Sequence, residues 1–132
     1  MELGLLLHVQ TLNFYDNDLS GPIPVSLGGL GTLEWIDLSR NALTGSLPVA
    51  LGGLSNLRVL VLDENLLTGQ IPSAFEDLTS LGILGMFDND LSGPIPVELT
   101  TLPNLWSLDL GHNELTGVIS GELGDVTTLE GA

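Results

Sequence analysis

The sequence predicts an α/β solenoid, a right-handed superhelix with short parallel strands on its concave face and 3₁₀ or helical turns on its convex face. Two observations predict this fold. Apolar residues, mostly leucine, keep a constant spacing along the chain, and one asparagine recurs every 24 residues, at Asn17, Asn41, Asn65, Asn89 and Asn113. A fixed period of this length is typical of stacked coils that share one continuous core.

The repeats run without a linker, so we expect a single domain over residues 1–132, built from about five repeats. The apolar opening segment has neither the basic leading residues nor the small-residue cleavage site of a signal peptide. Leu6 and Val9 are instead in phase with Leu30 and Leu33 of the next repeat. We therefore expect a partial repeat at the N-terminus.

Each full repeat should begin with a strand. In the unit 33–56, Ile36 and Leu38 alternate with polar residues, as in a strand with one buried face. The equivalent pairs in the other units are Leu12/Phe14, Leu60/Leu62, Leu84/Met86 and Leu108/Leu110. Stacking would place these strands in parallel, roughly 4.8 Å apart.

The asparagine after each strand is predicted to form a structural ladder. Its side-chain amide has two donors and an acceptor, so it can satisfy backbone groups left unpaired where the chain turns, coil after coil. A Leu-(Ser/Thr)-Gly-x-(Ile/Leu)-Pro segment follows, as in residues 67–72. Its glycine permits a tight bend, and its proline suits a sheet edge or a segment without ladder hydrogen bonds. The spacing of Leu51, Leu54 and Leu57 then predicts a short 3₁₀ turn.

One flank should carry a column of hydroxyl side chains at the coil spacing, at Ser20, Thr44, Thr68, Ser92 and Thr116. Such a column can form hydrogen bonds between coils, or it can act as a regular array that templates ice. We favour the first interpretation, because the repeat itself places a hydroxyl residue at this position.

The frame is clearest from Leu33 to Leu57, and it resembles the plant-type leucine-rich repeats of receptor-like kinase ectodomains and polygalacturonase-inhibiting proteins. The resemblance covers essentially the whole chain. It implies a protein that binds peptides, co-receptors or secreted enzymes on the concave sheet and its flank, outside the cell or at the cell surface. The chain lacks the cysteine-paired caps of that family, and it has no glycosylation sequon, so its own residues assign no compartment.

The composition excludes several kinds of partner. Seventeen acidic residues face only two basic ones, Arg40 and Arg58, for a net charge of −15. Such a surface repels nucleic acids and anionic lipids and favours a basic protein or peptide. The chain has no cysteine, which excludes disulfides and thiolate metal sites, and no motif calls for a cofactor.

The outward positions of the strands are the candidate binding site. Trp35, Val59 and Ile83 should lie side by side on three coils, next to Val61 and Phe87. An exposed apolar patch with a charged rim is typical of a binding site, although β-branched and aromatic residues also simply suit strands. Gly85 should leave a gap that a ligand backbone can approach.

The rim of this patch is acidic. Asp37, Asp63, Glu64 and Asp88 should steer and orient a basic partner, mainly through the association rate. The alternative is a solvated face that keeps a repeat protein soluble. Arg40 should relieve repulsion between Asp16 and Glu64.

Enzymatic and metal sites are not expected. The two histidines have no cysteine or placed serine to activate, and the carboxylates project from an open sheet. The segments that begin at Asp16 and Asp88 imitate a calcium loop. Leu27 and Leu99, however, stand where that loop needs a bidentate acid.

These observations predict a non-enzymatic recognition module, part of a receptor-like or inhibitor-like protein in signalling. The alternative is a structural spacer of a larger receptor whose ligand site lies in other repeats. Because each coil covers only its neighbours, both ends should expose apolar side chains. We therefore expect either a fragment of a longer array or end-to-end self-association through Leu3, Leu6 and Val9 at one end and Val126 and Leu129 at the other.

Overall fold

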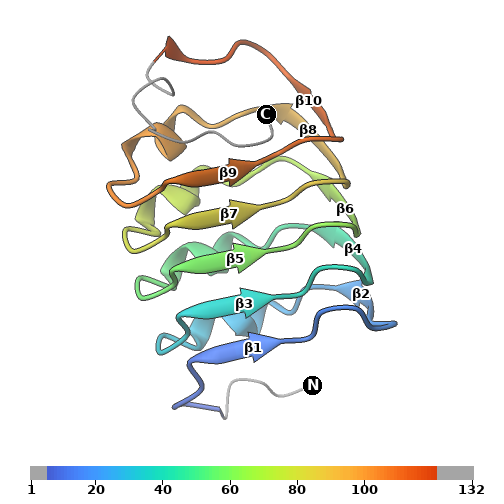
Figure 1. Ribbon diagram of the computed structural model, residues 1–132, viewed down its shortest axis with the longest axis vertical. Coiled ribbons are helices and arrows are strands. Elements are labelled where there is room, and N and C mark those ends of the chain that lie inside the picture. The colour runs from blue at the N-terminus through green and yellow to red at the C-terminus, as the bar shows by residue number, and fades with distance from the viewer. Residues whose placement is uncertain (1–5, 122–132) are drawn as a thin grey trace.

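The computed structural model describes residues 6–121, which wind into a solenoid of stacked coils (Figure 1). Each coil supplies a strand to a first parallel sheet, which faces the viewer in Figure 1. Its strands are β1 (Thr11–Asn13), β3 (Trp35–Asp37), β5 (Val59–Val61), β7 (Ile83–Gly85) and β9 (Ser107–Asp109), in that order. Leu3, Val126 and Leu129 lie outside the described residues.

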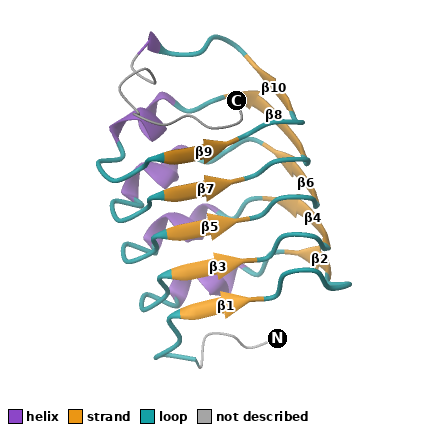
Figure 2. Cartoon of the chain, in the orientation of Figure 1, coloured by secondary structure: helices purple, strands orange, loops and turns teal. Residues whose placement is uncertain are grey.

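A second parallel sheet, which the sequence-based interpretation missed, runs along one flank (Figure 2). Its strands, in spatial order, are β10 (Glu114–Thr116), β8 (Asp90–Pro94), β6 (Leu66–Gly69), β4 (Ala42–Ser46) and β2 (Ser20–Pro22). The closing proline of each motif, such as Pro48 after β4, lies outside these strands, but the residues before it pair with neighbouring coils, which sequence patterning did not predict. Gly45, with a φ of +76°, shows how each repeat bends inside or just after its strand, a conformation that glycine adopts without steric cost.

The register of the second sheet also corrects the predicted hydroxyl column. Residues pair at a separation of 22 rather than 24, so Thr44 pairs with Leu66 and Thr68 pairs with Asp90. The residues of the predicted column are therefore not direct partners of one another, and Thr68 instead pairs with Ser46 on one side and Asp90 on the other.

Short 3₁₀ helices close the coils, as predicted, at η2 (Val25–Gly29), η3 (Val49–Gly53), η4 (Ser73–Asp77) and η5 (Val97–Thr101). A proline precedes each of them and fixes the backbone φ angle where the 3₁₀ helix begins. Pro48, for example, has a φ of −64°. Gly28 is required by the stacking, since a Cβ there would lie 2.2 Å from the carbonyl oxygen of Ala50 on the next coil. No helix between residues 6 and 121 is long and apolar enough to cross a membrane.

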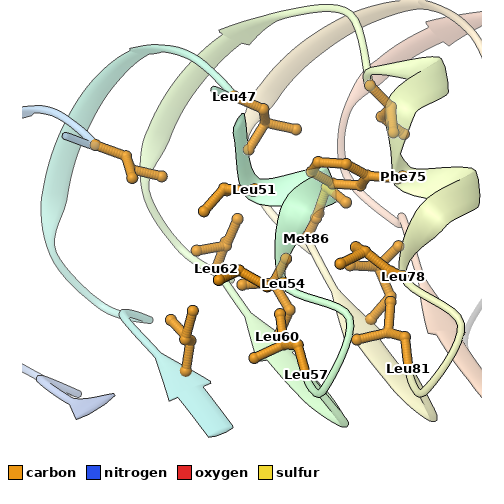
Figure 3. Close-up of a cluster of buried hydrophobic side chains, with 14 of the residues drawn as sticks. Leu47, Leu51, Leu54, Leu57, Leu60, Leu62, Phe75, Leu78, Leu81 and Met86 are labelled. Carbon is orange, nitrogen blue, oxygen red and sulfur yellow. The ribbon is translucent and has the colours of Figure 1, made fainter. Parts of the chain in front are cut away.

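The core is a ribbon of side chains between the first sheet and the 3₁₀ helices (Figure 3). Leu51, Leu54 and Leu57 from one coil are completely buried, together with Leu60 on β5 and Leu62 just after it. The predicted inward positions of the strands are confirmed. Truncating any one of these leucines to alanine should cost about 2–5 kcal/mol, because neighbouring coils cannot collapse into the cavity.

The asparagine ladder is confirmed in atomic detail. The Nδ2 of Asn65 donates to the carbonyl oxygens of Leu38 (3.1 Å) and Leu62 (3.1 Å), and its Oδ1 accepts from the backbone N–H of Leu43 (3.0 Å). One side chain thus ties its own coil to the preceding one. The same cross-coil pattern holds at Asn41, Asn89 and Asn113.

The residue before each ladder asparagine has a left-handed backbone, which sequence patterning did not predict. These residues are Asp16, Arg40, Glu64, Asp88 and His112, with φ between +50° and +57°. None is glycine, although the left-handed region is uncommon for other residues. The sharp turn out of the first sheet is therefore held by the ladder hydrogen bonds rather than by an intrinsically permissive residue.

Candidate recognition surface

The pairing of β3, β5 and β7 brings the predicted apolar anchors together. Trp35 pairs with Val59, and Val59 pairs with Ile83, so the three side chains lie side by side on the outer face of the first sheet, as expected. Trp35 is 42% exposed and Ile83 is half-buried, but Val59 is only 7% exposed. Val59 therefore supports its two neighbours and offers little surface of its own.

Phe87 and Val61 extend the apolar surface toward the strand ends. Both side chains are half-buried. The ring of Phe87 lies 4.7 Å from the ring of His112, with the two planes tilted by 38°. His112 thus enlarges the aromatic surface, which only knowledge of the spatial neighbours reveals.

The gap expected at Gly85 is filled, so the prediction that a ligand backbone approaches there is wrong. Gly85 is buried, and a Cβ at this position would lie 2.8 Å from Oδ1 of Asp63. The same oxygen accepts a hydrogen bond of 2.8 Å from the backbone N–H of Phe87. The carboxylate of Asp63 therefore crosses to the next coil and occupies the place of the missing side chain.

Three other coils show what this acceptor does. At the position equivalent to Gly85, Asn13, Asp37 and Asp109 each accept a hydrogen bond from the backbone N–H two residues later, at 3.0–3.1 Å. Gly85 has no side chain to do so. Asp63 of the preceding coil supplies the missing oxygen, so its first role is structural.

Asp63 also has an altered acidity. Burial raises the pKa of its carboxyl to about 6, and the negative charges of Asp109, Asp37 and Glu64 act in the same direction. The hydrogen bond from the N–H of Phe87 opposes this rise. The charge of Asp63 therefore changes in mildly acidic solution.

The remaining predicted rim residues differ in their surroundings. Asp37 is half-buried and accepts a hydrogen bond from the backbone N–H of Ser39, whereas Glu64 and Asp88 are exposed. Glu64 pairs with Arg40, whose Nε lies 3.1 Å from its Oε1. The hydrogen bond to Glu64 raises the pKa of the Arg40 guanidinium, which also lies 5.5 Å above the ring of Tyr15. Arg40 thus offsets the charge of Glu64, and Asp88 keeps an exposed charge.

The loops that begin at Asp16 and Asp88 resemble calcium loops in sequence. Within residues 6–121, no three His, Cys, Asp or Glu side chains are grouped so that they could hold a metal ion. The asparagines of these loops are engaged instead in the ladder, as Asn89 is with the carbonyl of Leu62.

Comparisons with known sequences agree with the repeat frame. Models described as "Leucine rich repeat" match residues 43–91 and residues 8–30 and 104–126. No curated protein matches the chain.

Solved structures include similar repeats from plants. The plant peptide hormone receptor RGFR1, in complex with RGF2, is 38% identical with a TM-score of 0.93, covering 97% of this chain and 20% of the receptor chain. A chain of the BIR3–SERK2 complex from Arabidopsis thaliana is also 38% identical, with a TM-score of 0.85, over 89% of this chain and 63% of that one. A plant ice-binding protein is 31% identical, with a TM-score of 0.88, over 93% of this chain and 40% of its own. The chain thus spans only a fifth of RGFR1.

Proposed function

Since this chain belongs to the leucine-rich-repeat family, in its plant type, we propose that it is a non-enzymatic module that binds a peptide or protein on the outer face of its first sheet. The observation that carries the proposal is the aromatic and aliphatic surface formed by the exposed Trp35 and the half-buried Ile83 and Phe87, with acidic side chains around it. The plant peptide hormone receptor RGFR1, which is 38% identical to this chain over the aligned fifth of the receptor, was solved in complex with RGF2.

Rigidity supports the proposal. The strands that present the surface are paired in register, and the ladder asparagines fix the turn at the end of each strand. A surface that is already ordered loses little conformational entropy when it binds, so more of the contact energy appears as affinity. Aromatic residues in such a patch are the usual anchors of an interface.

We propose further that the partner is basic near Asp88 and Asp37. Asp88 is exposed, and the chain carries a net charge of −15, so a cationic segment is attracted before it makes contact. This attraction acts mainly on the association rate and weakens with added salt. The acidic rim therefore selects and orients the basic partner, while the apolar residues hold it in place.

The experiment is a selection of peptides from a displayed random library on the immobilised 132-residue chain. Enriched peptides should carry an aromatic or aliphatic residue close to Lys or Arg. Their affinity should fall about tenfold or more when Trp35 and Phe87 are both replaced by alanine. The matched control replaces Val25 and Val49, exposed apolar residues on the 3₁₀ helices, and should bind like the parent.

The spacer function is the alternative outcome of this selection. It is favoured by one fact, that the chain spans a fifth of RGFR1. If enriched peptides bind the Trp35→Ala/Phe87→Ala variant as well as the parent, the outer face of the first sheet is not the binding surface. A spacer role would then be the better description.

An ice-binding function is less well supported, despite the similar plant ice-binding protein. A surface that matches ice needs a regular array without charges. On the second sheet Thr68 pairs with Asp90, and Ser92 pairs with Glu114. These carboxylates interrupt the hydroxyl pattern.

We also propose end-to-end association of the isolated chain. At the first coil an apolar cavity of about 300 Å³ opens between the sheets, lined by Leu12, Phe14, Ile23 and Leu27 among others. Leu6, which precedes β1, is also 43% exposed. A second copy could cover this surface as one coil covers the next. Sedimentation velocity should show an average mass that rises with concentration, and a constant monomer mass would contradict the proposal.

A further inference from the structure

A pocket that sequence patterning missed lies where the strands of the first sheet begin. It is an open cavity of about 490 Å³, to which three successive coils contribute. Its lining consists of Arg58, Val59, Ser80, Gly82, Ile83, Asn104 and Trp106. Neither Trp35 nor Phe87 is among the described residues that line it. A ligand in this pocket is therefore held mainly by residues other than the proposed peptide anchors.

A glycine gives the indole of Trp106 its place in the pocket. Gly82 is buried, and a Cβ there would lie 2.9 Å from Nε1 and 3.2 Å from Cδ1 of the indole. The backbone N–H of Trp106 donates to the carbonyl of Gly82 (2.9 Å), and the N–H of Gly82 donates to the carbonyl of Arg58 (2.8 Å). One edge of the ring thus lies against the glycine, while Trp106 remains 53% exposed. The indole is an apolar platform on a fixed backbone.

Neutral polar side chains accompany the indole. Nδ2 of Asn104 donates to the carbonyl oxygen of Thr79 on the preceding coil at 2.8 Å, which fixes the direction of the acceptor oxygen Oδ1. Ser80 adds a half-buried hydroxyl, which can donate and accept. The charged residue in the lining, Arg58, forms an ion pair with Glu34 at 3.5 Å. The pocket therefore combines one aromatic ring with neutral hydrogen-bonding groups.

We propose that this pocket binds a hexose unit of a neutral oligosaccharide, stacked on Trp106. A pyranose ring such as that of glucose presents C–H groups on its faces, and its hydroxyls project from its edge. The C–H face packs on the indole, and the hydroxyls at the edge form hydrogen bonds with Asn104 and Ser80. The inference goes beyond the proposed function, because both the ligand class and the main contact residues differ.

The surroundings of the pocket favour a neutral sugar over other ligands. An apolar peptide side chain would cover the amide of Asn104 and the hydroxyl of Ser80 without bonding to them, which costs free energy. An acidic sugar is disfavoured by the net charge of −15 and by the ion pair of Arg58 with Glu34. An apolar wall with a few convergent polar groups is typical of small-molecule sites.

The test adds cellotetraose, a neutral oligomer of glucose, to the 132-residue chain labelled with nitrogen-15. The chain has two tryptophans, so its two indole N–H signals report separately on Trp35 and Trp106. Cellotetraose should shift the Trp106 signal in a saturable way and leave the Trp35 signal in place. Sorbitol, which carries hydroxyls but no ring, should shift neither. Tetragalacturonate, an acidic oligomer of equal length, should bind about fivefold more weakly or worse.

Two equal substitutions on the same sheet identify the platform. Trp106→Ala should weaken the binding of cellotetraose about tenfold, measured by calorimetry, whereas Trp35→Ala should leave it unchanged. Trp106→Phe keeps an aromatic ring and should retain part of the affinity. Gly82→Ala should weaken binding because its Cβ displaces the indole. Ser80→Ala should weaken it about threefold, through the loss of one hydrogen bond.

The proposal is overturned if sorbitol shifts the Trp106 signal as cellotetraose does, or if Trp35→Ala is as harmful as Trp106→Ala. The absence of a saturable Trp106 shift with cellotetraose also overturns it. Tighter binding of tetragalacturonate would make the ligand an acidic glycan and overturn the neutral class. The peptide selection depends on Trp35 and Phe87 instead, so either proposal can fail alone.

Discussion

The carboxylate of Asp63 accepts a hydrogen bond of 2.8 Å from the backbone N–H of Phe87, a residue 24 positions later on the next coil. In three other coils the acceptor comes from the same coil, as with Asp109 and the N–H of Gly111. The pair Asp63 and Gly85 therefore acts as a unit, because the carboxylate fits only where residue 85 has no side chain. A residue on the apparent acidic rim is in this way part of the scaffold that holds Phe87.

Exchanging the acceptor tests this relationship. Asp63→Ala should cost about 1–2 kcal/mol of unfolding free energy, because the N–H of Phe87 loses its partner in a half-buried site. Gly85→Ala should cost a similar amount, since its Cβ meets Oδ1 of Asp63. The double variant Asp63→Ala/Gly85→Asp restores the arrangement of the neighbouring coils. Urea denaturation should show it to be more stable than the sum of the single changes predicts, and simple additivity would contradict the account.

Asp63 should also make stability depend on pH. Its folded pKa is raised from 3.8 to about 6, so between these values the folded chain binds more protons than the unfolded chain. The stabilisation of the folded chain by protonated Asp63 is therefore fully present below about pH 4, and it is lost as pH rises through 6.

Asp63→Asn keeps an acceptor oxygen for Phe87 but removes the charge. The variant should be as stable as the parent near pH 4 and about 1 kcal/mol more stable at pH 7. This gain is smaller than the full pKa shift of Asp63 implies, because solvent partly screens the site. Thermal unfolding at several pH values measures the difference. Asp77→Asn, an equal charge change at an exposed position on η4, is the control and should show no such trend.

The ladder asparagines should differ in importance with their place in the array. Asn65→Leu removes the partners of backbone groups on two coils and should cost about 3 kcal/mol or more. The Nδ2 of Asn17 donates only to carbonyls of its own coil, those of Phe14 and Tyr15. Asn17→Leu should therefore cost about 1 kcal/mol. Equal losses in chemical denaturation would show that the cross-coil hydrogen bonds do not matter.

The left-handed backbone at Asp88 predicts that this position tolerates glycine. Asp88 has a φ of +55°, a conformation that glycine adopts readily and β-branched residues avoid. Asp88→Gly should change stability by less than about 0.5 kcal/mol, whereas Asp88→Val should cost about 1–2 kcal/mol. Comparable thermal midpoints for the two variants would contradict this interpretation.

Once a selected basic peptide is in hand, the rim can be tested kinetically. Asp88→Asn should lower the association rate constant about twofold to threefold at low salt and leave the dissociation rate nearly unchanged. The effect should fade at high salt, where exposed charges are screened. Asp77→Asn is again the control. An unchanged association rate for Asp88→Asn would indicate that the acidic rim serves to keep the protein soluble and does not steer the partner.

The repeat architecture could be predicted from the sequence because its signal is periodic. One coil fixes the burial of the next, so the inward positions of Ile36, Leu60 and Leu84 follow from spacing alone, as does the ladder. The contiguity of Trp35, Val59 and Ile83 follows from the same period. These predictions needed no knowledge of individual contacts.

The features that could not be predicted break the period. Gly85 looks like a gap until Asp63 is seen to fill it, and Val59 looks exposed until its neighbours are placed. The pocket that Gly82 shares with Arg58 and Trp106 likewise becomes visible only when the coils are stacked. The second sheet escaped notice because glycine and proline argue against strands, while here the glycine bends each repeat within or just after its strand.

The central claim, that the outer face of the first sheet binds the partner, is tested most directly by mapping amide and indole chemical-shift changes when a selected peptide is added to the nitrogen-15-labelled chain. The account predicts that the largest changes fall on β3, β5 and β7, at Trp35, Ile83 and Phe87. Changes confined to the 3₁₀ helices η2–η5 or to the second sheet, with the Trp35 indole signal unmoved, would contradict it.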